Sequence, residues 1–297
     1  MRRPNLSARR LAACVALLTG LAQALSAAEI LIGDAKSQRE SLTAAPSGIL
    51  IVGSASTPFV YKVRPGSATA EKFVDASAEG PGTFFFGMLV EPATKTLWTC
   101  QLTPVPDTRP AKRHTSLRGF DVSTGAQKLR WDLPGDSSMC NDFSVGPDKA
   151  LYITDTTGGK IYKLPAGAST AELFLEHAAL RGVDGITFLD GTLYVNNVSA
   201  SKIYRIPVDA GKAGQPVEIA LDQPIKGPDG MRAANGKILV AENGSGKISV
   251  ITVNGDKGTV TVIKEGLKTP TAVEPAGDTI WIAERGTGKA VSIPMPK

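Results

Sequence analysis

Short apolar segments separated by turn residues recur along most of this chain. Their apolar and polar positions alternate, or β-branched and aromatic residues gather in them, which is typical of strands, and no long segment repeats with a helical period. Four segments resemble one another: a short strand, a tight polar turn, a second strand, a loop with Gly or Ser, and a third strand that opens with Lys. They read "NDFSVGPDKALYITDTTGGKIYKL", "DGITFLDGTLYVNNVSASKIYRI", "DGMRAANGKILVAENGSGKISVI" and "TAVEPAGDTIWIAERGTGKAVSI".

Two weaker copies lie upstream, in "ESLTAAPSGILIVGSASTPFVYKV" and "GMLVEPATKTLWTCQL". Further β-type segments lie between the copies and supply a fourth strand to each, such as "TAEKFVD", "QKLRWDL", "AELFLE", "PVEIAL" and "TVTVIKE". Six units of about 45 residues with four strands each are the layout of a β-propeller. The pattern therefore predicts an all-β, six-bladed propeller with four antiparallel strands in each blade.

The two ends of the repeat region complement each other. The last copy stops after its third strand, at "AVSIPMPK", whereas the segment 29–34, "EILIGD", offers a spare strand. A propeller hides its strand edges by closing, and an open edge strand is a template for aggregation. We therefore expect residues 29–297 to form one domain, closed by the N-terminal strand of the mature chain, which completes the last blade.

One position of the repeat carries candidate chemistry. Counting back from the second strand of each copy to the entry of its first strand gives Glu40, Gly87, Asn141, Asp184, Asp229 and Thr271. Equivalent positions of a propeller circle the central channel, so we call these six residues the ring. Three carboxylates there would repel each other by about 3 kcal/mol per pair at roughly 5 Å and an effective dielectric constant of about 20.

A divalent cation would relieve this repulsion, since no Lys or Arg occupies the ring, and hard cations such as Ca²⁺ bind oxygen ligands. The ring therefore predicts a cation site formed by Glu40, Asn141, Asp184 and Asp229. Another interpretation stays open. Asp and Asn are common in turns, where they bond their own backbone, so that "PDG" and "VDG" are also compatible with simple turns.

These motifs resemble those of the regucalcin/gluconolactonase family of six-bladed propellers, which are also called senescence marker protein-like. The matching elements are Glu40-Ser41, Asn141-Asp142, Asp184 and Asp229 within "PDGM". The resemblance implies one divalent cation, most often Ca²⁺ with Zn²⁺, Mn²⁺ or Mg²⁺ as alternatives. It also implies opening of a lactone or related ester, with Asp229 as general base and Asn141 as a ligand of the cation or the substrate.

The chain departs from the family at two positions. Asp184 stands where the family usually has Asn, which adds a negative charge to the site. Met139 stands where family members often carry an arginine, which puts a sugar-acid lactone substrate in doubt.

The longest irregular stretch, "QLTPVPDTRPAKRHTSL", is expected on the same face as the ring. Long loops often bind ligands, so Arg109 and His114 are candidates for contacting an anionic substrate; a solvated loop is the alternative. Cys100 ends a strand at that face and Cys140 precedes the ring residue Asn141. We expect these two cysteines to form a disulfide, which an exported protein can keep.

The first 28 residues have the layout of a secretory signal: a basic start, an apolar stretch and the small residues "SAA". The apolar stretch is too interrupted for a membrane span. Four of the 33 basic residues and none of the 28 acidic residues lie in this segment, so the mature chain is nearly neutral. We expect a periplasmic or secreted protein, a monomer with a small-molecule substrate, which binds neither nucleic acid nor, once the signal is removed, a membrane.

Three functions are compatible with this sequence. The leading hypothesis is an exported, cation-dependent hydrolase of the gluconolactonase type. The alternatives are a phosphotriesterase-type hydrolase on the same site and a non-catalytic propeller that binds a ligand or a protein. The acidic ring favours the enzymes, because a scaffold has no need of it, whereas Gly87, Thr271 and Met139 favour the scaffold.

Overall fold

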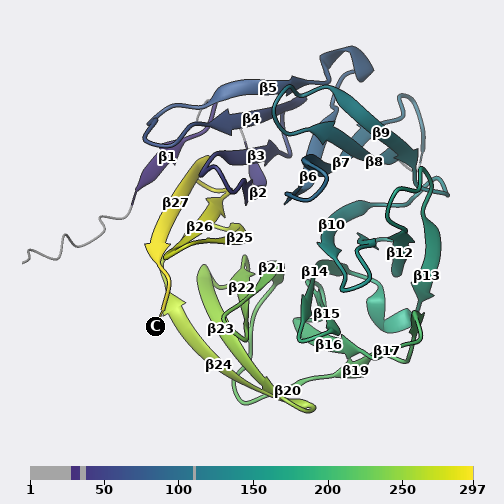
Figure 1. Cartoon of the computed structure of the whole chain (residues 1–297), viewed down its shortest axis with the longest axis vertical. Helices are drawn as coiled ribbons and strands as arrows, with labels where there is room; N and C mark the ends of the chain where they lie inside the picture. Colours follow the sequence, from purple (N-terminus) through teal and green to yellow (C-terminus); the bar gives the residue numbers. More distant parts are fainter. Residues whose placement is uncertain (1–27, 34–37, 110–111, 297) are drawn as a thin grey trace, which may run out of the picture.

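The computed structural model describes residues 28–33, 38–109 and 112–296, and it is an all-β, six-bladed propeller (Figure 1). The predicted signal segment 1–28 lies outside the described residues except for Ala28. The blades follow each other around a central channel in the order of the sequence, and each contributes four antiparallel strands. The predicted fold is thus confirmed. No helix among the residues described is long and apolar enough to cross a membrane.

The first strand of every blade lies innermost and the fourth lies at the rim (Figure 1). Blade 1 consists of β2 (Arg39–Ala44), β3 (Leu50–Ser54), β4 (Phe59–Val63) and β5 (Glu71–Asp75). Blade 2 consists of β6 (Phe84–Glu91), β7 (Thr96–Pro104), β8 (Arg113–Asp121) and β9 (Gln127–Asp132). Blade 3 consists of β10 (Cys140–Val145), β11 (Leu151–Asp155), β12 (Lys160–Leu164) and β13 (Glu172–Glu176).

The second half repeats this order. Blade 4 consists of β14 (Val183–Leu189), β15 (Thr192–Asn197), β16 (Lys202–Ile206) and β19 (Val217–Glu218). Blade 5 consists of β21 (Pro228–Ala234), β22 (Lys237–Glu242), β23 (Lys247–Asn254) and β24 (Lys257–Lys264). Blade 6 consists of β25 (Pro270–Ala276), β26 (Thr279–Glu284), β27 (Lys289–Pro294) and β1 (Glu29–Leu31).

The N-terminal strand closes the propeller as predicted. β1 pairs antiparallel with β27, with Glu29 opposite Val291 and Leu31 opposite Lys289. Ile30 and Ile32 are buried in the apolar core that blades 6 and 1 share, so the closing strand is held by packing as well as by its ladder. The first and last parts of the chain therefore lie side by side (Figure 1).

One segment differs from the prediction. "PVEIAL" was expected to be a single outer strand of blade 4, but only β19 pairs there, whereas β20 (Ala220–Leu221) runs parallel to β24 and adds a fifth strand to blade 5. Ile219 between them is buried against both blades. The long β23–β24 hairpin leaves an edge that β20 covers in part, which protects it from pairing with another chain.

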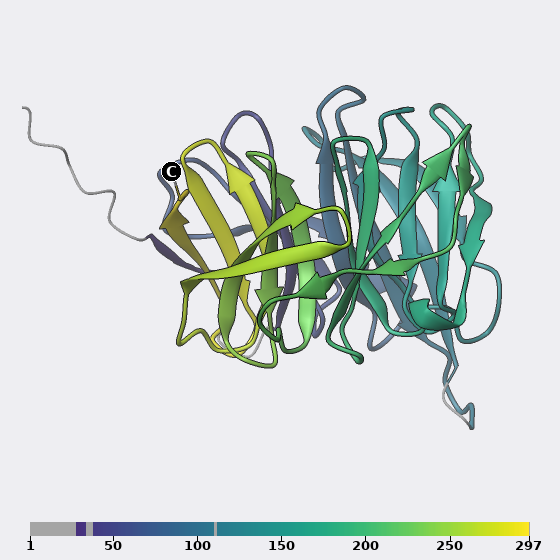
Figure 2. The same ribbon diagram turned by 90° about the horizontal axis from the view of Figure 1, so that it is seen from below.

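Apolar side chains fill the spaces between neighbouring blades. Between blades 2 and 3 the core contains Phe86, Leu117, Phe143 and Ile153, all buried. In profile the propeller is a thick disc, and the connection from β7 to β8 projects from one of its faces (Figure 2). Packing of this kind fixes the blades against each other, so the residues at the channel have defined positions.

The channel itself is crossed by one charged side chain. Arg232 on β21 donates hydrogen bonds from Nη1 and Nη2 to the two carboxylate oxygens of Asp142 on β10, at 2.8 and 3.1 Å. Its Nε bonds Glu274 Oε2 on β25 at 3.2 Å, and its Nη2 bonds the backbone oxygen of Met88 on β6 at 3.1 Å. Glu274 Oε1 in turn accepts from Thr43 on β2. This largely buried guanidinium therefore joins four of the six blades directly and a fifth through Glu274.

We expect Arg232→Met to lower the free energy of unfolding by about 3–5 kcal/mol, because it leaves two buried carboxylates without their cation. Urea denaturation of the mature protein measures this. The matched control is Arg64→Met, since Arg64 pairs with Glu71 at the exposed surface, where an ion pair is worth about 0–1 kcal/mol. Equal losses in the two variants would contradict the central role of Arg232.

Candidate functional site

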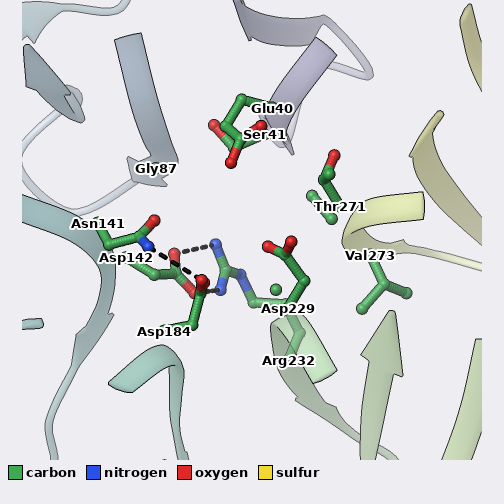
Figure 3. Close-up of a pocket in the computed structure, with 12 residues that line it drawn as sticks. Glu40, Ser41, Gly87, Asn141, Asp142, Asp184, Asp229, Arg232, Thr271 and Val273 are labelled. Atoms are coloured by element: carbon green, nitrogen blue, oxygen red, sulfur yellow. Dashed lines mark hydrogen bonds and ion pairs between the residues drawn. The ribbon is translucent and has the colours of Figure 1, made fainter. Parts of the chain in front are cut away.

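A bulge at the start of each blade directs the ring residues. In every blade the residue before the ring position pairs with the second strand, and the register then shifts. In blade 3, for example, Cys140 pairs with Asp155 and the shift follows at Asn141. Such bulges bend a strand and re-aim its side chains. All six ring residues line one pocket at the mouth of the channel (Figure 3).

The pocket brings together the side chains that the sequence selected. Glu40, Asn141, Asp184 and Asp229 are all buried, with 6–7% of their surface exposed. Asn141 Nδ2 donates to Asp184 Oδ2 at 3.0 Å, and the charge of Asp184 raises the pKa of Asp229. The free space between these groups is about 10 Å³, which is close to the room for one water-sized sphere. The site is therefore sized for a single small ion or water.

The backbone under the ring is fixed by polar side chains of the preceding blade. Thr154 Oγ1 on β11 donates to the backbone oxygen of Asp184 at 2.8 Å, and Asn196 Nδ2 on β15 donates to that of Asp229. Both donors are fully buried. Each of these two carboxylates is therefore positioned by a neighbouring blade and not by its own loop alone.

A second circle of residues surrounds the ring and was missed by sequence reasoning. It consists of residues that directly follow the second strands. Thr156 Oγ1 accepts from Asn141 Nδ2 at 2.9 Å, and Asn243 Nδ2 donates to Asp229 Oδ2 at 2.7 Å. Arg285 Nη1 lies 3.2 Å from Glu40 Oε2. The alignment of the six copies that identifies the ring would also identify this circle, because its members all directly follow the second strand of their copy.

Burial raises the pKa of all three ring carboxyls, and repulsion from neighbouring carboxylates adds to this for Asp184 and Asp229. Burial raises the pKa of Glu40 to about 7, against the opposing effect of Arg285. Burial, Glu40 and Asp142 raise the pKa of Asp184 well above its usual value. Burial, Asp184 and Glu40 do the same to Asp229, against the effects of Asn243 and Arg285. The ring thus holds negative charge only at an energetic cost.

Other buried carboxylates of this face differ in their surroundings. The last residues of the second strands cap the loops that follow: Asp155 Oδ1 accepts from two backbone N–H groups, of Met139 and Gly158, at 2.8 and 2.9 Å. Glu242 Oε2 similarly accepts from the backbone of Lys226. Glu40 Oε2 is buried without a hydrogen bond, as is Asp155 Oδ2, but of these two residues only Glu40 lines the central pocket. Asp155 and Glu242 hold loops, whereas Glu40 has an oxygen still available to a ligand.

Two ring residues, Gly87 and Thr271, carry neither a carboxyl nor an amide, and the structure explains both. Gly87 adopts φ of +51°, and a Cβ there would collide with the backbone oxygen of Asn141. Glycine lets the backbones of blades 2 and 3 approach each other closely. Thr271 Oγ1 donates to the backbone oxygen of Arg39 at 3.0 Å and so ties blade 6 to blade 1. Neither position counts against a functional ring.

The donor set suits a hard cation in its chemistry, with one obstacle. Three carboxylates and an amide oxygen are the ligand types that Ca²⁺ and Mg²⁺ prefer, and the unbonded oxygen of Glu40 is directed to their pocket. However, in the described part of the chain no three acidic, His or Cys side chains stand close enough for a ready-made metal site. Binding would require Asn141 to turn its amide oxygen inward and Glu40 to leave Arg285.

The predicted substrate contacts do not reach this pocket. Arg109 and His114 belong to the β7–β8 hairpin, are exposed, and do not line the central pocket; His114 lines a separate cavity with Lys112 and Asp136. The β7–β8 connection projects from one face of the disc (Figure 2), and neither Arg109 nor His114 lines the central pocket. The floor of the pocket is formed instead by Arg232, which sequence reasoning did not select.

The structure contains a disulfide between Cys100 on β7 and Cys140 on β10. Both residues are fully buried. The bridge links blades 2 and 3 directly beside Asn141, so it supports the part of the ring next to Gly87. Met139, on the other side of Cys140, lies 3.8 Å from Arg113 Nη1, measured at its sulfur.

The shape of the chain is similar to those of several solved proteins. A gluconolactonase from Xanthomonas campestris superposes with a TM-score of 0.68 at 19% identity, covering 91% of this chain and 90% of that one. Regucalcin from Agrobacterium tumefaciens, described as a calcium-binding protein, gives 0.61 at 19% identity over 90% and 96%. Virginiamycin B lyase from Staphylococcus aureus gives 0.64 at 15% identity over 91% and 99%. The neighbours thus include gluconolactonase and regucalcin, as the resemblance predicts.

No protein-family model and no curated protein sequence matches the chain. At these low identities the structural similarity shows the shared fold, and folds of this kind support several functions. The function must therefore be argued from the ring.

The raised pKa values predict how stability depends on pH. Glu40 is protonated below about pH 7 in the folded, cation-free protein but only below about 4.5 when unfolded, so the folded state binds more protons between these values. The free energy of unfolding should therefore fall as pH rises from 5 to 8, with about 3 kcal/mol from Glu40. Urea denaturation in EDTA at several pH values measures this.

Glu40→Gln should flatten this pH dependence, because the neutral amide has no proton to lose. Glu91→Gln serves as the control, since Glu91 lies at the far end of β6, bonded to the indole of Trp98, and should keep the full slope. A stability that rises over the same pH range would refute the assignment of the proton to the ring.

Proposed function

We propose that this protein is an exported hydrolase that opens a lactone or related ester at a divalent cation bound by the ring. The observation that carries this proposal is the convergence of three buried carboxyls and one amide, from four separate blades, on a space for one ion. Burial without compensating bonds is costly for Glu40, and a bound cation, most often Ca²⁺, would offset that cost. Export is supported by the signal-like segment 1–28.

In this proposal Glu40, Asn141, Asp184 and Asp229 would hold the cation. When bound, the cation would polarise the carbonyl of the substrate and stabilise negative charge on its oxygen. A small-molecule substrate would approach the ring from the mouth of the channel. We expect the protein to act as a monomer, since one chain supplies all six residues of the ring.

Asp229 is the candidate general base. Its carboxylate accepts a proton from water as the water oxygen bonds to the carbonyl carbon of the lactone. The ring C–O bond then breaks, and the leaving oxygen takes the proton from Asp229, which gives a hydroxy acid. Asn243 donates to Asp229 Oδ2 and so leaves the other oxygen to face the pocket. A base positioned in this way contributes about 10²- to 10⁴-fold to a rate.

Among hydrolytic and related activities of the neighbours, the geometry favours the gluconolactonase type. One solved lyase is described as catalytically inactive when a histidine is replaced by alanine, and no histidine lines the central pocket of this chain. The rival from another class is a propeller that binds a ligand without reaction. The Glu40–Arg285 ion pair favours it, since this pair already neutralises one carboxylate.

Calorimetric titration with Ca²⁺ distinguishes these functions. The EDTA-treated mature protein should bind one equivalent, and Asp229→Asn should bind at least tenfold more weakly because a ligand charge is lost. The rate of acid release from a simple lactone should fall by about 10²-fold or more in Asp229→Asn. Glu91→Gln removes a carboxylate outside the pocket and should change neither value. Cation binding without turnover would favour the ligand-binding propeller.

A further inference from the structure

Arg285 stands at the mouth of the pocket in a fixed place. Its backbone N–H donates to the oxygen of Thr269 at 3.0 Å, and that of Gly286 donates to Lys268 at 2.9 Å, so the loop after β26 is held to the strand entry of its own blade. Only the side chain is then free to change position. That side chain is 36% exposed, whereas the Glu40 side chain that it contacts is 7% exposed.

The guanidinium forms hydrogen bonds with a neutral partner, whereas its contact with Glu40 is an ion pair only. Arg285 Nε and Nη2 donate to Gln38 Oε1 at 3.1 and 2.8 Å. The contact of Nη1 with Glu40 Oε2 is 3.2 Å long but lacks hydrogen-bond geometry, so this oxygen has no hydrogen bond. Arg285 can therefore release Glu40 while it keeps both bonds to Gln38, and the release involves little rearrangement.

The charges of the ring suggest a role for Arg285. Glu40, Asp184 and Asp229 gather three carboxyls in one pocket, so their negative charge needs a positive partner whenever no cation is bound. Among the described residues, Arg285 is the only basic one that forms an ion pair with a ring carboxylate, and it also acts on Asp229 electrostatically. Arg232 beneath is occupied by Asp142 and Glu274. The guanidinium of Arg285 thus supplies positive charge to the ring carboxylates while no cation is bound, and a cation would replace it.

We propose that Arg285 is a built-in competitor of the cation: it neutralises Glu40 in the cation-free protein, releases it when a divalent cation binds, and thereby sets the affinity of the site. This inference rests on the proposed function and concerns the regulation of the same site. Arg285 keeps the vacant ring from accumulating negative charge, and it makes cation binding depend on displacing an ion pair.

Calcium titration of EDTA-treated mature protein, with Arg285→Gln and Arg285→Lys beside the wild type, tests the competition. Arg285→Gln should bind Ca²⁺ at least tenfold more tightly, since both the competitor and its repulsion of the cation are removed. Arg285→Lys keeps the charge but lacks the fork that bonds Gln38 and Glu40 together, so its affinity should lie between the other two. Arg64→Gln makes the same charge change at the far, exposed Arg64–Glu71 pair and should bind as the wild type does.

The outcomes separate this inference from the proposed function. Binding by the wild type with equal or weaker binding by Arg285→Gln would overturn the inference and leave the cation site intact. Binding by Arg285→Gln alone would support the inference in its strongest form. Failure of every variant to bind Ca²⁺, with circular dichroism showing that each is folded, would overturn the proposed function and the inference together. A purely structural role of Arg285 would lower stability without tightening the binding of Ca²⁺.

Discussion

The buried contact of Arg232 with Asp142 and Glu274 organises the centre of this propeller. A propeller channel brings the first strands of six blades close together, and each of these strands carries backbone and side-chain polar groups towards the axis. A single guanidinium with five donors can bond several of them at once, which water or a shorter lysine could not do with the same geometry. Asp142 follows Asn141, and Arg232 and Glu274 lie three residues beyond Asp229 and Thr271. The network therefore fixes the strands that carry the ring residues, directly next to the ring.

The ring above this network treats its charges in the opposite way. Where the channel network pairs every buried charge, the ring gathers three carboxyls and leaves them underpaired, which raises the pKa of each. Unfavourable burial of this kind is common where a protein binds or reacts, because the rest of the fold offsets the cost. The disulfide between Cys100 and Cys140 and the closing strand β1 contribute to that rigid surrounding.

The repeat pattern predicted most of the fold, because six similar units leave few alternatives to a closed propeller. It also placed the ring, since the count from the second strand depends only on strand and turn lengths. Three features were out of reach. The pairing of β20 with blade 5 depends on the packing of Ile219. The course of the β7–β8 hairpin keeps Arg109 and His114 out of the pocket. The bonds of Arg232 across the channel join residues that are far apart in sequence. Sequence patterns report local alternation, whereas these features depend on which blades face each other.

The contrast between Arg232 and Arg285 explains how one channel can be both rigid and responsive. Both arginines contact carboxylates near the axis, but Arg232 is enclosed and makes hydrogen bonds in two directions, so its displacement would leave charges buried without partners. Arg285 lies beside the mouth of the pocket, bonds Gln38 as well as pairing with Glu40, and is exposed enough to be solvated if it leaves Glu40. The depth of each arginine in the channel therefore decides its role. A charge at the bottom must be permanent because nothing can replace it, whereas a charge at the mouth can be exchanged for one that arrives from solution.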